Sequence, residues 1–162
     1  MIRVSAASAL VLLSAGNVMA YEALAVMPAD EHMLRTGQGT VQILARSGET
    51  DGKLGIVISD DQYGGPGRSV RLSGTSQTFF VLEGVYEFHL GPEVFEAEAG
   101  TLVSVDAGQT YGYFSKGKGR LMTIYSPGGF EQFFSEWANK GIGPGPELEA
   151  LERKFGLTRD SP

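Results

Sequence analysis

Residues 64–84 read GGPGRSVRLSGTSQTFFVLEG, and this stretch decides the fold because its second half is the most strand-like run in the chain. Residues 78–82 form a continuous block of side chains that favour β-strands. Residues 83–84 then supply a turn, and residues 85–90 alternate strictly, with large apolar side chains on one face and a glutamate and a histidine on the other. The pattern predicts a β-hairpin with one buried face.

The composition extends this prediction to the rest of the chain. The 162 residues are 42% hydrophobic and 20% charged, which suits one globular domain with extensions. The 23 glycines fall mostly between apolar runs, as expected for short strands joined by tight turns. An all-β protein is therefore expected.

Charge and cysteine usage exclude several classes of function. A net charge of −6 disfavours a nucleic-acid partner or an anionic membrane surface, since either partner needs a basic face. The sequence has no cysteine, which excludes disulfides, thiolate metal sites and a cysteine nucleophile.

Residues 1–20 have the organisation of a signal peptide. A positive start at Arg3 precedes an uncharged apolar stretch at residues 6–15, and small residues at 18–20 suit a cleavage site before Tyr21. The apolar stretch is too short for a bilayer core, which needs about 20 residues, so we expect no membrane span. The predicted location is secreted or periplasmic. The alternative is a cytoplasmic protein that retains residues 1–20 as an N-terminal strand or helix.

The remaining chain contains many short strand patterns. We expect strands at residues 40–45, 54–59, 70–72, 78–82, 85–90, 94–98, 101–105, 111–114 and 120–125. Residues 60–67 are expected to form a loop because glycine and proline interrupt them. Residues 22–26 form at best a short edge strand. So many short strands within about 90 residues predict a sandwich or a closed barrel.

A helical tail is predicted to follow the strands. Aromatic side chains recur there at helical spacing, at Phe130, Phe133, Phe134 and Trp137. They predict a helix over residues 130–139 whose aromatic stripe packs on the barrel. A second short helix is expected over residues 147–155, stopped by Gly156. The predicted domains are thus a barrel at 21–128 and a helical tail at 129–162.

Two residue spacings match the two motifs of the cupins. The first runs through Gly64, Val70, Leu72, Gln77 and Gly84, and the second through Gly100, Asp106, Gly108, Tyr111 and Ser115. From about Thr40 to the C-terminal helix the chain resembles the small single-domain cupins of the conserved-barrel or quercetinase-like group. Residues 79–84 and 126–134 also resemble short sequence segments of that group. The resemblance implies a double-stranded β-helix, or jelly-roll barrel, and a homodimer.

The same resemblance bears on whether the chain binds a metal. Cupins of this kind usually bind one through two histidines and a glutamate of the first motif and a histidine of the second. At these positions the sequence has Val70, Leu72, Gln77 and Tyr111. Valine and leucine have no donor atom, glutamine is a weak ligand, and a phenol would first have to lose a proton. We therefore expect no metal in the usual place and no cofactor.

Neither of the two histidines in the chain is expected to take the place of the missing metal ligands. His32 stands beside acidic residues in an irregular segment, which is typical of a solvated side chain. His89 falls on the strand face opposite Tyr86 and Phe88, so it is expected outside the barrel.

Strand alternation predicts which side chains line the barrel. It places Val70 with Leu72, Gln77 with Phe79, and Tyr111 with Tyr113 and Ser115 on the inner face. Such a lining suits a small apolar or aromatic molecule. Gln77 and Tyr111 are the candidate recognition and catalytic residues, bonding to each other, to water or to a ligand, because buried polar groups need partners. The alternative is that these side chains fill the barrel and leave no cavity.

Three functional hypotheses follow. The first is a metal-free cupin that binds a small apolar or aromatic molecule, and whose enzymatic form is a cofactor-independent isomerase, cyclase or lyase in which Tyr111 polarises a carbonyl. The second is a metal-dependent quercetinase-like dioxygenase with relocated ligands. The third is a non-catalytic dimeric scaffold with a filled barrel.

Overall fold

The structure is a computed structural model that describes residues 33–36, 39–62 and 69–159. Three sequence-based expectations fall outside these ranges: the signal peptide at residues 1–20, the edge strand at residues 22–26 and the solvated state of His32.

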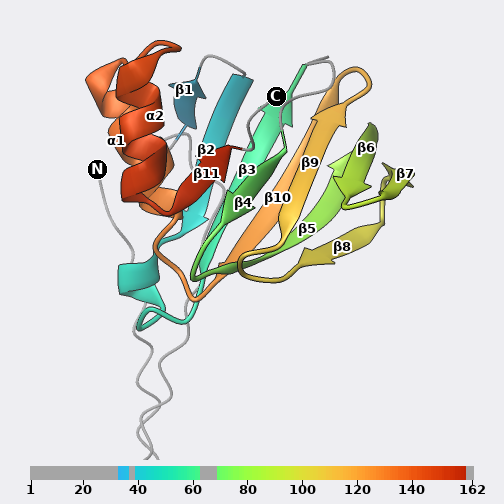
Figure 1. Cartoon of the computed structure of the whole chain (residues 1–162), viewed down its shortest axis with the longest axis horizontal. Coiled ribbons are helices and arrows are strands. Elements are labelled where there is room, and N and C mark those ends of the chain that lie inside the picture. The colour runs from blue at the N-terminus through green and yellow to red at the C-terminus, as the bar shows by residue number, and fades with distance from the viewer. Residues whose placement is uncertain (1–32, 37–38, 63–68, 160–162) are drawn as a thin grey trace, which may run out of the picture.

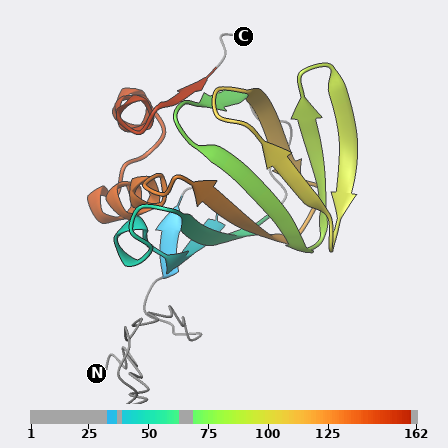
Figure 2. The same ribbon diagram turned by 90° about the horizontal axis from the view of Figure 1, so that it is seen from below.

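Two antiparallel sheets face each other (Figure 2). The six-stranded sheet has the order β1-β2-β3-β10-β5-β8. Its strands are β1 (Met33–Thr36), β2 (Gly39–Ala45), β3 (Gly55–Asp61), β10 (Gly119–Ser126), β5 (Ser76–Glu83) and β8 (Leu102–Val105). The five-stranded sheet has the order β11-β4-β9-β6-β7. Its strands are β11 (Leu157–Arg159), β4 (Val70–Leu72), β9 (Thr110–Ser115), β6 (Val85–Leu90) and β7 (Glu93–Glu98).

This arrangement confirms the predicted all-β jelly roll, but the predicted hairpin of β5 and β6 is wrong. β5 pairs with β10 and β8, whereas β6 pairs with β7 and β9, so the two strands belong to different sheets. β5 has no free edge for β6 because both of its edges are occupied. Gly84, at φ 85°, carries the chain between the sheets, and a Cβ at this position would lie 2.5 Å from the Lys118 carbonyl oxygen.

The predicted burial of β6 is nevertheless correct. Tyr86 and Phe88 are completely buried. They belong to the cluster between the two sheets, together with Phe79 and Val81 of β5. Local alternation therefore identified the buried face of each strand even though it misassigned the pairing of the strands.

Helices α1 (Glu131–Lys140) and α2 (Pro146–Lys154) follow the strands, as predicted, and lie together beside β1 and β11 (Figure 1). A short 3-10 helix, η2 (Ser47–Glu49), precedes β3. None of the helices in the described parts of the chain is both long and apolar enough to cross a lipid bilayer.

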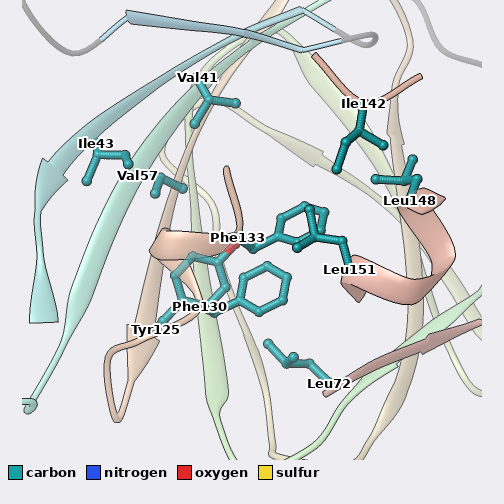
Figure 3. Packing of buried hydrophobic residues seen from close by; sticks show 10 residues of the cluster. All are labelled: Val41, Ile43, Val57, Leu72, Tyr125, Phe130, Phe133, Ile142, Leu148 and Leu151. Carbon is teal, nitrogen blue, oxygen red and sulfur yellow. The ribbon is translucent and has the colours of Figure 1, made fainter. Parts of the chain in front are cut away.

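The aromatic stripe of α1 packs on the sheets. Phe130 and Phe133 are buried in a second cluster, and Phe134 and Trp137 pack against it. Figure 3 shows how side chains from the helices and the strands meet there. The cluster also contains Leu72 at the end of β4. The helical tail thus covers one end of the jelly roll.

Strand β11 was not predicted because its three residues, Leu-Thr-Arg, include a single apolar side chain and so show no alternation. It forms where the chain leaves α2 and pairs with β4, placing Leu157 opposite Leu72. The Arg159 guanidinium donates two hydrogen bonds to the Glu152 carboxylate of α2, one of them 2.8 Å long. Pairing with an existing strand edge and this ion pair fix β11.

Candidate functional site

The candidate residues Tyr111 and Gln77 meet inside the jelly roll. The Tyr111 hydroxyl donates a 2.6 Å hydrogen bond to Gln77 Oε1. Only 4% of Tyr111 and 2% of Gln77 are exposed. The two side chains were expected to bond to each other, to water or to a ligand, and the structure shows the hydrogen bond between the two side chains.

The predicted pocket-lining residues separate into different environments. Val70 and Phe79 pack in the cluster between the sheets, and Ser115 donates a hydrogen bond to a backbone oxygen. Leu72 differs from the expectation: β4 ends where the helices cover the jelly roll, so this side chain joins the cluster below α1 and α2. Tyr113 alone of these five borders the cavity found between the sheets.

That cavity has a volume of about 60 Å³. Strand alternation on both sheets directs polar side chains into it. They are Thr40 of β2, Ser59 and Asp61 of β3, Thr123 and Tyr125 of β10, and Tyr113 of β9. Phe134 and Trp137 of α1 complete the wall on the helical side. The cavity has room for a few water molecules or for a small organic group.

Asp61 is the carboxylate of this cavity. Its Oδ2 atom accepts hydrogen bonds from the Tyr86 hydroxyl at 2.9 Å and from Ser59 Oγ at 3.1 Å. No hydrogen bond from the described residues ends on Oδ1. Burial raises the pKa of Asp61; the bonds from Tyr86 and Ser59 oppose the rise, and the charge of Asp60 adds to it. One oxygen is thus held in place, and the residue as a whole lines the cavity.

Sequence reasoning missed Asp61 because it assigned this residue to a loop. The signal that identifies it is alternation: residues 57, 59 and 61 share one face if the strand is extended by two residues. Because glycines and a proline follow Asp61, the strand was predicted to end two residues too early.

Three buried tyrosines, Tyr86, Tyr111 and Tyr125, and the partly buried Tyr113 accompany the carboxylate. Burial raises the pKa of Tyr111 to about 12 and raises the pKa values of Tyr86, Tyr113 and Tyr125 well above the ordinary value for a phenol. The charge of Asp61 also raises the pKa of Tyr113 and of Tyr86. All four phenols therefore stay protonated at neutral pH, where they act as hydrogen-bond donors.

Comparison with solved structures gives likenesses over about two thirds of the chain. KdgF from Halomonas sp. has a TM-score of 0.58 and 17% identity, with 67% of this chain and 99% of that chain covered. An RmlC-like cupin from Shewanella frigidimarina also has a TM-score of 0.58, with 20% identity and coverage of 68% and 96%. The chain has the cupin fold.

A third cupin-like structure is Pac13, described as a nucleoside dehydratase. It has a TM-score of 0.55 and 19% identity, with 68% of this chain and 87% of that chain covered. No family profile and no curated protein matches the sequence itself. At these identities the likenesses establish the cupin fold and leave the reaction open.

The residues at the usual cupin ligand positions do not fit a metal. Val70 and Leu72 offer no atom that can coordinate a metal, and the Tyr111 hydroxyl is hydrogen-bonded to the Gln77 side-chain oxygen. Within residues 33–36, 39–62 and 69–159, no three side chains of His, Cys, Asp or Glu gather to hold one elsewhere. His89 pairs with Glu87 at 2.7 Å, and 37% of its side chain is exposed.

Proposed function

We propose that this chain is a metal-independent cupin that binds a small apolar or aromatic molecule bearing one polar group. The observation that carries the proposal is the cavity between the sheets, where Asp61 and Tyr113 offer polar atoms beside the rings of Phe134 and Trp137. Pockets of this type combine apolar walls with a few fixed polar groups.

The size of the cavity limits the ligand. A volume of about 60 Å³ is well below the about 300–1,000 Å³ of pockets that enclose drug-sized molecules. The cavity therefore suits a compact molecule or the functional end of a longer one. A flavonoid-sized substrate, as the dioxygenase alternative requires, does not fit within it.

The enzymatic form of the proposal is non-redox chemistry without a cofactor: an isomerase, cyclase or lyase. Protonated phenols in a buried site stabilise a developing negative charge on a substrate oxygen. The fold is compatible with such chemistry, since the similar structure Pac13 is described as a dehydratase. Tyr113 takes the donor role expected for Tyr111, whose hydroxyl is engaged by Gln77.

The test uses Trp137, which borders the cavity and is the single tryptophan of the chain. Full-length protein is titrated with cyclopentanone, cyclohexanone or phenol while tryptophan emission is followed. Binding gives a saturating change, whereas collisional quenching is linear. A Ser59→Leu variant, which fills the cavity, should lose the saturating change, and a Thr158→Val variant on the exposed strand β11 should retain it. A linear response of the wild type to every probe contradicts the proposal.

The second candidate function is a dimeric scaffold with a filled barrel. The closed Tyr111–Gln77 pair and the small cavity favour it. So do the exposed Leu102 of β8 and Val94 of β7, which lie on strands at the edges of the two sheets. This candidate predicts a stable dimer by light scattering, together with a linear fluorescence response to every probe.

A further inference from the structure

The cavity brings together a base and a proton donor from opposite sheets. Asp61 ends β3 of the six-stranded sheet, and Tyr113 stands in β9 of the five-stranded sheet. Both line the same space of about 60 Å³. Neither sheet alone supplies both groups.

Each of these side chains is held by its surroundings. Asp61 is fixed through Oδ2 by Tyr86 and Ser59, and we assign the role of base to its other oxygen, Oδ1. The Tyr113 ring is packed between other aromatic rings, with centroid distances of 5.1 Å to Phe79 and 5.4 Å to Phe88. Groups held in this way need little reorganisation when a substrate reacts.

The protonation states suit opposite roles. Burial raises the pKa of Asp61, which makes its carboxylate a stronger base than an exposed aspartate. Burial and the nearby carboxylate raise the pKa of Tyr113, which keeps its phenol protonated. A basic carboxylate beside a neutral donor is the arrangement that removes a proton next to a carbonyl group.

We propose that this cavity catalyses proton transfer on a small carbonyl compound, with Asp61 as the base and Tyr113 as the hydrogen-bond donor to the carbonyl oxygen. The inference rests on the proposed function, because it uses the same binding cavity, and it specifies the substrate class and the catalytic residues.

The reaction balances without a co-reactant. Asp61 Oδ1 takes a proton from the carbon beside the carbonyl, the C–H bond breaks, and its electron pair moves into the carbon–carbon–oxygen system. The negative charge that develops on oxygen accepts the hydrogen bond of the Tyr113 phenol. The protonated carboxyl exchanges its proton with the solvent before it returns one to the same carbon, which gives isotope exchange, or it delivers the proton to another carbon of a conjugated substrate, which gives an isomer.

The experiment follows the exchange of α-hydrogens of cyclopentanone in deuterated water by proton NMR, with the full-length protein. We expect saturable acceleration by the wild type and a loss of about 100-fold in Asp61→Asn. Tyr113→Phe should lose about as much, because it removes the donor to the oxyanion. Asp51→Asn is the matched control, since this side chain is 87% exposed and has the same change of charge.

Binding and chemistry are measured separately by recording Trp137 emission with cyclopentanone for each variant. If cyclopentanone binds but the wild type exchanges no faster than Asp61→Asn, the proton-transfer inference is overturned and the binding proposal stands. If no probe binds to the wild type, both are overturned. Should Asp61→Asn fail to fold, Tyr113→Phe decides: an unchanged exchange rate in this variant contradicts the inference.

Discussion

Tyr111 and Gln77, which the sequence resemblance predicts at two of the cupin ligand positions, form a hydrogen bond with each other. The Tyr111 hydroxyl and Gln77 Oε1 are 2.6 Å apart and buried. A hydrogen bond between neutral side chains contributes about 1 kcal/mol to stability, but a buried partner left alone costs more. Replacing one of the two side chains should therefore lower the free energy of unfolding more than replacing both.

A double-mutant cycle tests this description of the pair. Tyr111→Phe leaves Gln77 Oε1 without its donor and should lower the free energy of unfolding by about 1–3 kcal/mol. Adding Gln77→Leu should recover part of that loss. The measurement is urea unfolding of all four proteins, and strictly additive losses contradict a coupled pair.

The ionisation of Asp61 makes the stability of the folded chain depend on pH. Folding raises its pKa, so at pH values above the reference value of 3.8 the folded chain retains a proton that the unfolded chain has released. Over this range stability from this group decreases as pH rises, and the loss is complete once the pH exceeds the folded-state pKa.

The Asp61→Asn variant should therefore be more stable than the wild type at pH 7, and the difference should shrink as the pH is lowered towards 3.8. Asparagine keeps an oxygen that accepts the bonds from Tyr86 and Ser59. Urea unfolding at a series of pH values measures the difference. A gap of constant size at every pH argues against a buried, titrating carboxyl.

Among the helical elements, the start of α1 depends on Glu131, a fully buried carboxylate. Its oxygens accept hydrogen bonds from the backbone N–H of Ser47 at 2.8 Å and of Gly129 at 2.6 Å. Gly55 makes room for it, since a Cβ there would lie 2.2 Å from Glu131 Oε2. One side chain thus ties α1 to the 3-10 helix η2 and to the first residue of β3.

Glu131→Ala should lower the free energy of unfolding by about 3 kcal/mol, because two partly buried N–H groups lose their acceptor. Glu131→Gln should lose less, since its amide oxygen still accepts one of these bonds. Glu147→Ala is the control, being an exposed glutamate in the first turn of α2. Thermal unfolding compares the three variants, and equal effects of Glu131→Ala and Glu147→Ala contradict the role given to Glu131.

For the whole molecule, two facing sheets and a helical cover produce two separate interiors. One cluster lies between the sheets and surrounds Tyr113, and the other lies under α1 and α2 and includes Leu72. The tail is bonded to the sheet through β11, which pairs with β4. The candidate cavity lies between the sheets beside α1, so both layers shape it.

The proposed metal independence is a property of the purified protein and can be measured directly. Dialysis against a strong chelator should leave both the melting temperature and the saturating fluorescence response to cyclopentanone unchanged. Elemental analysis of protein purified without chelator is the companion measurement. A stoichiometric transition metal whose removal lowers the melting temperature would support the dioxygenase alternative with relocated ligands.

Nine of the strands, their buried faces and the amphipathic helix α1 could be predicted from the sequence, because they follow from short-range periods of apolar side chains, whereas β1 and β11 were not predicted. Gln77, Phe79, Tyr86 and Phe88 are buried as alternation predicted. That Val70 and Leu72 replace metal-binding residues stays a prediction from the sequence resemblance.

Only the tertiary structure decided which strands pair and which polar groups share a cavity. Pairing depends on contacts between distant segments, so local patterns could not show that β5 and β6 enter different sheets or that β11 joins β4. For the same reason Asp61, at the boundary of a predicted loop, became a candidate only when folding placed it and Tyr113 around one cavity.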